Sequence, residues 1–212
     1  MSGLLILGAG GHGKVVAEIA ALTGKLGKIA FLDDNSNLKN VNGIPVVGRL
    51  DDFDRLKDDY GYAFVAIGNN RKRLGFIDRI SKAGFQIPVL THPFTSISGN
   101  CSIGPGTAVM AGAVINTNVT IGKGCIVNTS SSVDHDCVIE DGVHISPGAH
   151  IGGTSRIGRN SWICIGASIS NNINIGSESK VAAGAAVITD VEANTLVGGV
   201  PAVVKKRIGV AK

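Results

Sequence analysis

The longer part of this chain follows a six-residue hydrophobic rhythm. From Ile97 to Val187 every sixth residue is Ile or Val, without a slip. Four residues after each of these positions the side chain is small or β-branched, as in Cys101, Ala113 and Ser131. A hexapeptide repeat of this kind predicts a parallel β-helix, in which three hexads make one coil and the branched side chains stack inward. The repeat is long enough for about five coils.

The first ninety residues instead alternate short apolar runs with helical patterns. We expect a loop with a turn at Asn42-Gly43 between the second strand and the second helix. Strands are predicted at 4–7, 29–32, 63–67 and 87–90. Three helices are predicted: one between Gly13 and Gly24, one near 51–59 and one at 71–83. This βαβαβαβ order predicts a small parallel α/β sheet.

The two rhythms predict two domains. Residues 1–92 are expected to form a Rossmann-like α/β half-domain, and residues 93–212 an all-β parallel β-helix with a C-terminal cap. Pro93 restricts the residue before it to extended conformations and marks a rigid boundary. His92 is interpreted as a junction residue.

A glycine-rich turn follows the first predicted strand. Gly8, Gly10 and Gly13 satisfy G-x-G-x-x-G, and Asp33 lies twenty residues after Gly13. Such glycines let backbone N–H groups approach a pyrophosphate at a helix N-terminus, and the carboxylate can accept from ribose or sugar hydroxyls. The motif alone favours a dinucleotide, but the repeat begins before a second half-domain can form. A single half-domain of this kind is typical of a protein that binds one nucleotide, such as a nucleotide sugar. The alternative interpretation is that the glycine turn only packs the helix against the strand.

Composition and charge narrow the classes of function. The net charge is only +4, and the single basic cluster is Lys205-Lys206-Arg207, so nucleic-acid binding is not expected. The apolar run at 4–7 is too short for a signal peptide or a membrane span, which predicts a cytoplasmic protein. Three of the four cysteines, Cys101, Cys125 and Cys137, occupy the small inward slot of the repeat and are predicted to be buried, reduced thiols.

One ionisable cluster stands out in the repeat. His135 lies two residues after an inward Val and is flanked by Asp134 and Asp136. A carboxylate beside a neutral imidazole stabilises the imidazolium that forms, which makes the ring a proton acceptor near neutral pH. The alternative interpretation is a solvated surface histidine.

Two other histidines and the only tryptophan also belong to the repeat. His144 and His150 are six residues apart and therefore fall on different faces of one coil, with His135 assigned to the third face. Three faces cannot bring their histidines to one metal within a chain, so no metal site is expected. Trp162 lies eighteen residues after His144 and should stack above it, either at a subunit interface or beside a ligand.

Taken together, several segments resemble a known family over nearly the whole chain. The chain is similar to bacterial sugar-nucleotide acetyltransferases of the left-handed β-helix superfamily, the PglD/NeuD type, and to those acting on UDP-4-amino sugars in particular. The segments that carry the resemblance are Gly8 to Gly13, Phe31 to Asp34, Ala66 to Asn70, Asn128 to Ser131, His135 to Ile139 and Gly198 to Ala202.

The resemblance implies a homotrimer that binds a nucleotide sugar through the N-terminal domain and acetyl-CoA along a left-handed β-helix. It implies that His135 is the general base, assisted by Asp136 where relatives usually have Glu. It places His144, Gly153, Ile165 and Gly184 at the acetyl-CoA site. The residues it assigns to the nucleotide-sugar site are Gly11, His12, Gly13, Asp33, Asp34, Gly68 and Asn69.

The expected activity is transfer of acetyl from acetyl-CoA to the amine of a nucleotide-linked sugar, with no metal. Three alternatives stay open at this point. A hydroxyl acceptor, as in sialic acid O-acetylation, needs the same base and donor. The glycine motif also allows a nicotinamide oxidoreductase, and the repeat allows a non-catalytic nucleotide-sugar-binding assembly protein.

Overall fold

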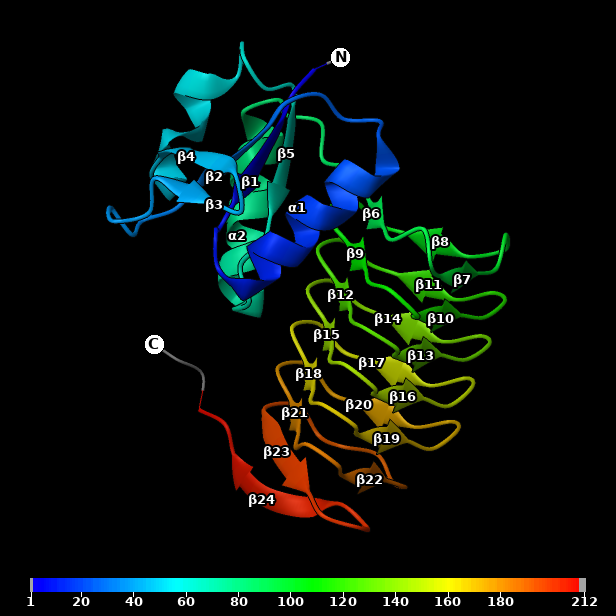
Figure 1. Ribbon diagram of the computed structural model, residues 1–212. Helices are drawn as coiled ribbons and strands as arrows, with labels where there is room; N and C mark the ends of the chain where they lie inside the picture. The colour runs from blue at the N-terminus through cyan, green and yellow to red at the C-terminus, as the bar shows by residue number, and fades with distance from the viewer. Residues whose placement is uncertain (1, 210–212) are drawn as a thin grey trace. The chain divides into compact units, whose positions relative to one another are not determined.

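The computed structural model describes residues 2–209, which form two compact units (Figure 1). The first unit ends at Pro93 and the second begins at Phe94.

The first unit is an α/β layer built on a five-stranded sheet of order β3-β4-β2-β1-β5. Neighbouring strands from β4 to β5 run parallel, as predicted. Its elements are β1 (Leu4–Leu7), α1 (Gly11–Thr23), β2 (Ile29–Leu32), β3 (Asn40–Val41), β4 (Ile44–Gly48), the 3-10 helix η1 (Leu50–Leu56), β5 (Tyr62–Val65), α2 (Asn70–Lys82) and β6 (Leu90–Thr91).

Two expectations for this unit are corrected. The predicted loop around Asn42-Gly43 is a hairpin, β3-β4, and β4 extends the sheet beside β2. Asn42 and Gly43 have φ of 52° and 83°, which suits the two-residue turn that an Asn-Gly pair favours. The strand predicted at 87–90 shrinks to β6, because Pro88 has no N–H to give to a ladder.

Both faces of β1 are buried, which explains its unbroken run of leucine and isoleucine. Because β2 lies on one side of β1 and β5 on the other, the chain direction across the sheet reverses at β1. The crevice at the carboxyl ends of strands beside such a reversal is where open α/β sheets bind ligands. Helices α1 and α2 both begin at this edge, directly after β1 and β5.

The second unit is a three-sided prism of sixteen two-residue strands, β7 to β22, in three parallel sheets. Face 1 holds β7 (Ser96–Ile97), β10 (Val114–Ile115), β13 (Ser132–Val133), β16 (His150–Ile151), β19 (Ser168–Ile169) and β22 (Ala186–Val187). Face 2 holds β8 (Ser102–Ile103), β11 (Thr120–Ile121), β14 (Val138–Ile139), β17 (Arg156–Ile157) and β20 (Asn174–Ile175). Face 3 holds β9 (Ala108–Val109), β12 (Ile126–Val127), β15 (His144–Ile145), β18 (Trp162–Ile163) and β21 (Lys180–Val181).

The hexad prediction is therefore confirmed strand by strand. Each strand ends on the Ile or Val of the six-residue rhythm and pairs in register with the strand eighteen residues away, as Val133 pairs with Ile151. From Val109 to Val187 these branched side chains are buried and form one continuous core.

Left-handed backbone geometry turns the chain at each corner. From Gly106 to Gly184 the third residue after each inward Ile or Val carries a positive φ, as at Asn118, Asp136 and Thr154 on the corner between faces 1 and 2. Gly, Asn and Asp tolerate this conformation best, which explains their frequency in the repeat.

The small inward slot of each hexad satisfies backbone groups of the next coil. Thr107, Ser155 and Ser161 donate a hydroxyl hydrogen bond to the carbonyl fifteen residues ahead, at 2.9 to 3.0 Å. The thiols of Cys125 and Cys137 reach the corresponding carbonyls at 3.1 and 3.2 Å. The thiols of Cys125 and Cys137 are free and buried, as predicted, whereas Cys101 is free but only half-buried.

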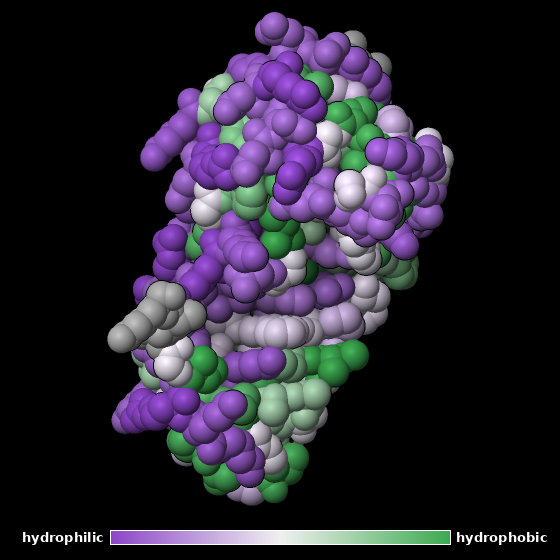
Figure 2. Space-filling view, turned by 90° about the vertical axis from the view of Figure 1, so that its left-hand side faces the viewer, coloured by the Kyte–Doolittle hydropathy of each residue, from purple (hydrophilic) through white to green (hydrophobic). Residues whose placement is uncertain are grey.

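The C-terminal end of the prism is closed by a hairpin of β23 (Thr195–Gly198) and β24 (Val203–Arg207). Strand β23 adds to face 3 beside β21. Large apolar side chains remain exposed here, at Ile188, Val200, Val203 and Val204. Green surface gathers over this end of the molecule in Figure 2.

Candidate functional site

The corner between faces 1 and 2 holds an ordered histidine–carboxylate pair. The Nδ1 atom of His135 lies 2.8 Å from Oδ2 of Asp136. Asp136 sits at the corner position with φ of 59°, and its other oxygen accepts a hydrogen bond from Asn118 at 3.1 Å. Asp134 accepts from the His135 backbone N–H at 2.8 Å. The corner turn thus holds the imidazole by its side chain and by its backbone.

The hydrogen bonds set the charge preference of this cluster. The hydrogen bond to Asp136, followed by the charge of Asp134, raises the pKa of His135 above its ordinary value. The hydrogen bond from His135 lowers the pKa of the Asp136 carboxyl. Because the carboxylate occupies Nδ1, that nitrogen carries a proton and Nε2 keeps the lone pair of the neutral ring. His135 is therefore arranged as a base at Nε2.

Gly153, one coil after His135, leaves the space that the imidazole fills. A Cβ atom at Gly153 would lie 2.7 Å from both Cε1 and Nε2 of His135. Any larger residue there would displace the ring. The structure brings Gly153 to His135 and Asp136, not to His144, Ile165 and Gly184.

His144 lies on face 3, away from that corner. Its Nε2 atom is 3.3 Å from the side-chain nitrogen of Asn128, and its ring stacks on Trp162 with 5.6 Å between centroids, as the register predicted. The sequence analysis did not single out Asn128 for this contact, although Asn128 belongs to one of the segments that carry the resemblance. The sequence signal that could have found it is a side-chain amide followed by three small hydroxyl residues, Thr129, Ser130 and Ser131.

Ile165 and Gly184 meet at the corner between faces 3 and 1. The Gly184 N–H donates to the Ile165 carbonyl at 3.0 Å, and the Ile165 side chain is 58 % exposed. Gly148, Gly166 and Gly184 stack here at eighteen-residue spacing, and a Cβ atom on any of them would have nothing within 4 Å. This glycine column is an unobstructed strip along one edge of the prism.

The candidate residues of the prism therefore form two groups. His135, Asp136 and Gly153 lie on the corner between faces 1 and 2. The second group is His144 on face 3, with Ile165 and Gly184 on the corner between faces 3 and 1. In a triangular coil the corner of His135 is opposite face 3, and face 1 separates it from the corner of Ile165 and Gly184, so the two groups do not meet within one chain. We expected His135 on the face that holds neither His144 nor His150, which is face 2. It lies instead on the corner before face 2, within the four-residue turn between β13 and β14.

In the first unit the glycine turn has the geometry expected of its motif. A Cβ at Gly13 would lie 2.0 Å from the Gly8 carbonyl oxygen, so this glycine allows α1 to pack on β1. Gly10, Gly11 and Gly68 have open space where a Cβ would be. The side chain of Asn69 caps α2 by accepting from the Lys72 N–H at 3.0 Å. The structure brings Gly11, Gly13, Gly68 and Asn69 to the same edge of the sheet.

His12 follows the turn and lies near a buried arginine. Arg73 has no exposed surface and donates to the carbonyls of Ile67 and Gly68 and to the Asn70 side chain. Burial, with a smaller effect of the Arg73 charge, lowers the pKa of His12 to about 4. His12 is therefore neutral at physiological pH, and its buried Nε2 has no hydrogen-bond partner among the described residues.

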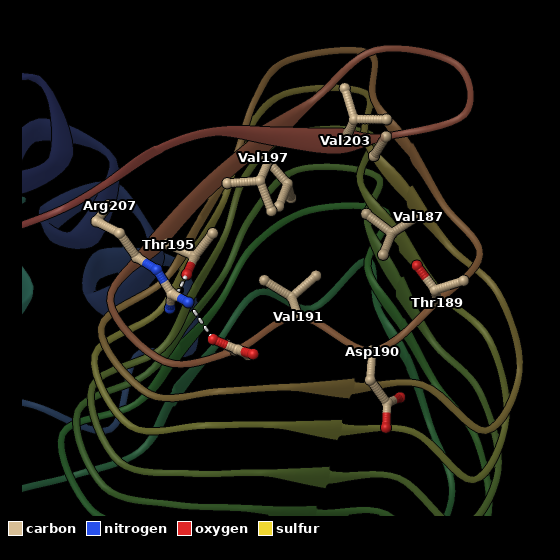
Figure 3. A pocket seen from close by; sticks show the side chains of 11 residues that line it. Val187, Thr189, Asp190, Val191, Thr195, Val197, Val203 and Arg207 are labelled. Carbon is tan, nitrogen blue, oxygen red and sulfur yellow. Dashed lines mark hydrogen bonds and ion pairs between the residues drawn. The ribbon is translucent and has the colours of Figure 1, made fainter.

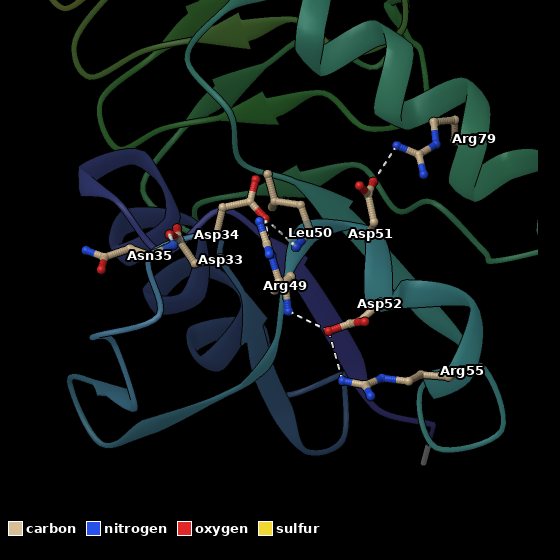
Figure 4. Close-up of polar contacts among 9 residues, drawn as sticks. All are labelled: Asp33, Asp34, Asn35, Arg49, Leu50, Asp51, Asp52, Arg55 and Arg79. Carbon is tan, nitrogen blue, oxygen red and sulfur yellow. Dashed lines mark hydrogen bonds and ion pairs between the residues drawn. The ribbon is translucent and has the colours of Figure 1, made fainter.

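The two aspartates after β2 are engaged by backbone and side chains (Figure 4). Asp33 accepts from the N–H groups of Ala9 and Asn35 at 2.8 and 2.9 Å. Asp34 accepts from the Leu50 N–H and pairs with Arg49. Asp33 thus ties the glycine turn to the end of β2, a structural role that the motif did not reveal.

A hollow of about 360 Å³ opens at the C-terminal end of the prism (Figure 3). Val187, Val191, Val197 and Val203 point toward one another in it, whereas Arg207 reaches Glu192 and Thr195. None of the predicted site residues lines this hollow.

Among residues 2–209 there is no helix long and apolar enough to span a membrane, and no cluster of three or more potential metal ligands.

The fold and site define a hexapeptide-repeat β-helix protein with an N-terminal Rossmann-like α/β unit. Residues 3–80 match the family description "PglD N-terminal domain". The acetyltransferase domain of PglB from Neisseria gonorrhoeae FA1090 is 42 % identical, with a TM-score of 0.93 over 96 % of this chain and 100 % of that one. The chain belongs to the PglD-type sugar acetyltransferase family.

Two further relatives are informative. A histidine-to-asparagine variant of perosamine N-acetyltransferase from Caulobacter crescentus, solved with CoA and GDP-perosamine, is 33 % identical, with a TM-score of 0.92 over 97 % of this chain and 98 % of that one. UDP-N-acetylbacillosamine N-acetyltransferase of Bacillus subtilis is 34 % identical over 116 residues. That match spans 52 % of this chain and 52 % of the curated relative, about half its length.

Proposed function

We propose that this protein is an acetyl-CoA-dependent N-acetyltransferase that acts on the amine of a nucleotide-linked sugar, with His135 as the general base. The observation that carries the proposal is the His135–Asp136 pair, joined at 2.8 Å and seated against Gly153. Similarity to an acetyltransferase domain solved with acetyl coenzyme A and to a perosamine N-acetyltransferase solved with CoA and GDP-perosamine supports the donor and the class of acceptor.

The proposed chemistry uses the lone pair on Nε2 of His135. As the sugar nitrogen attacks the thioester carbonyl carbon, Nε2 removes a proton from that nitrogen and the ring becomes imidazolium. The tetrahedral intermediate then collapses, the C–S bond breaks, and the CoA thiolate leaves and takes up a proton. Asp136 stabilises the imidazolium, which is the same effect that raises the pKa of His135.

The acyl donor fits the second group of residues. The glycine column at Gly148, Gly166 and Gly184 offers an open edge for an extended thioester arm, beside the exposed Ile165. His144 lies on the adjoining face. We assign acetyl-CoA to these residues and to Gly153.

A complete site then needs two copies of the chain. The base corner and face 3 lie on opposite sides of one prism, so the acyl donor held by one copy must meet His135 of a neighbour. We propose a homotrimer, since a head-to-tail contact between the His135 corner of one copy and face 3 of the next closes into a ring when it repeats around a three-fold axis.

Complementation tests this arrangement. Trimers assembled from His135→Ala chains alone, or from His144→Ala chains alone, should be inactive. Trimers reassembled from an equal mixture should regain part of the activity, because some contacts then pair an intact His135 with an intact His144. If the mixture stays as inactive as each parent, the shared site is wrong.

The nucleotide sugar is assigned to the first unit, through Gly11, His12, Gly13, Gly68 and Asn69, with Asp33 and Asp34 at the adjoining strand end. Backbone N–H groups at the starts of α1 and α2 suit a diphosphate. We propose a UDP-linked 4-amino sugar. The name of the B. subtilis relative, UDP-N-acetylbacillosamine N-acetyltransferase, supports UDP, and GDP-perosamine is the comparison to test.

The decisive assay follows release of the CoA thiol with acetyl-CoA and a panel of UDP-, GDP- and CMP-linked amino sugars. His135→Ala should lower kcat/KM by about 100- to 10,000-fold on the active acceptor. His150→Ala is the matched control, because His150 is also an exposed prism histidine but pairs with Ser132 on face 1. Background thiol release with every acceptor would contradict the proposed function.

A further inference from the structure

Three side chains on face 3 form a stack, which we call the aromatic column: His144, Trp162 and Lys180. They are register partners on β15, β18 and β21. The rings of His144 and Trp162 are nearly parallel, at 5° between planes, and Lys180 Nζ lies 3.9 Å from the centroid of the Trp162 ring. Such a stack joins an imidazole, an indole and an ammonium group through their faces.

The indole is fixed independently of the imidazole. Its Nε1–H donates to the Ser146 hydroxyl at 2.8 Å, and Lys180 covers one side of the ring. Trp162 nevertheless keeps 40 % of its surface exposed, which is unusual for the largest apolar side chain. A half-exposed ring held by a hydrogen bond and a cation is a rigid platform for its neighbour.

Asn128 contacts one ring nitrogen of His144 and bears on where the ring carries its proton. The Asn128 side-chain oxygen accepts from the Thr129 N–H at 2.8 Å, so its amide nitrogen is the atom facing His144 Nε2 at 3.3 Å. An amide nitrogen only donates, so Nε2 must accept. This contact therefore favours the neutral imidazole tautomer that carries its proton on Nδ1.

We propose that Trp162 is a positioning residue: its indole fixes the ring plane of His144 so that the hydrogen bond from Asn128 holds the neutral tautomer with the proton on Nδ1. Without the indole, the half-buried imidazole loses the aromatic face that defines its ring plane, and we expect its alignment with Asn128 to be lost. A role of the His144 Nδ1–H group in acetyl transfer rests on the proposed function, in which His144 faces the acyl donor. The tautomer of His144 does not depend on the proposed function.

Nitrogen NMR of histidine-labelled protein tests the tautomer without any substrate, and a His144→Gln spectrum assigns the signal. Wild type should show His144 neutral with the proton on Nδ1. Trp162→Leu should show a mixture of tautomers, and Trp162→Phe, which keeps an aromatic face, should resemble wild type. A wild-type His144 signal in Trp162→Leu would overturn the proposal, as would a wild-type protein with the proton on Nε2.

Kinetics test the consequence for catalysis. Trp162→Leu should lower kcat by about 10- to 100-fold with little change in KM for the sugar, since a misdirected group near the reacting atoms loses transition-state stabilisation. Trp162→Phe should stay within about threefold of wild type. Ser168→Leu, an equally placed outward residue on face 1, is the control and should leave kcat unchanged. Equal kcat for Trp162→Leu and wild type would overturn the positioning role.

The two experiments separate the two claims. If wild type transfers no acetyl group to any acceptor, the proposed function fails while the NMR result still decides the role of Trp162. If wild type is active and Trp162→Leu retains both its kcat and its tautomer, the proposed function stands and the positioning role is wrong.

Discussion

Replacing Gly153 by Ala is the smallest change that should disable the base. The new methyl carbon would lie 2.7 Å from Cε1 and Nε2 of His135, whereas carbon atoms in contact prefer about 3.5 to 4.0 Å. The imidazole must therefore move by about 1 Å, and the 2.8 Å hydrogen bond to Asp136 must stretch or break. Asp136 cannot easily follow, because it is held at a corner φ of 59° and by Asn118.

A displacement of this size near reacting atoms costs about 100-fold in rate. We expect Gly153→Ala to lower kcat/KM by about that factor, measured by CoA thiol release, and to lower the pKa of His135 toward its ordinary value, measured by NMR titration. Thermal unfolding should change little, because the half-exposed ring can swing into solvent. Gly99→Ala is the matched control, since a Cβ there meets nothing within 4 Å. Wild-type kcat/KM and an unchanged His135 titration in Gly153→Ala would refute the reasoning.

Other substitutions test separate parts of the structure. Asp136→Asn removes the main cause of the raised His135 pKa, so the rising limb of the pH–rate profile should shift to lower pH and the maximal rate should fall about tenfold; an unshifted limb would mean that another group titrates. Because the pKa of His12 falls from 6.5 to about 4 on folding, the unfolded chain binds more protons between these values, and stability should rise with pH across that window. His12→Gln should flatten that rise in denaturant titrations, and an equally steep rise would contradict the assignment. Ile145→Ala should destabilise the prism by about 2 to 5 kcal/mol, since Ile145 is fully buried in its core; a loss under about 1 kcal/mol would show that the coils relax around the cavity.

The six-residue rhythm sufficed to predict the prism because one geometric requirement repeats in every hexad. A branched residue must point inward and a left-handed residue must turn the corner, so Ile145 and Gly148 could be assigned to core and corner from spacing alone. The first unit obeys no such period. Its hairpin at Asn42-Gly43 escaped prediction because the flanking strands are short and half-exposed, with little alternation to mark them.

The site was predictable where charge broke the pattern. His135 and Asp136 stand out among small corner residues, and the eighteen-residue spacing placed Trp162 beside His144. The contact of Asn128 with His144 crosses from one coil to the next along a diagonal, and depends on side-chain rotamers that spacing does not specify. The carboxylate of Asp33 could equally have faced a ligand or the glycine turn, and only the three-dimensional structure places it 2.8 Å from the Ala9 N–H.

The corner that holds His135 recurs once per coil, with Thr117, Gly153 and Asn171 at the equivalent positions. Strands stack about 4.8 Å apart, so each coil advances equivalent residues along the prism axis by that fixed distance. Moving the histidine–aspartate pair by eighteen residues in the sequence would shift it by one coil along the axis and leave the Ile and Val core unchanged. Evolution can therefore set the depth of a reactive group along this axis by choosing a coil, without redesigning the fold.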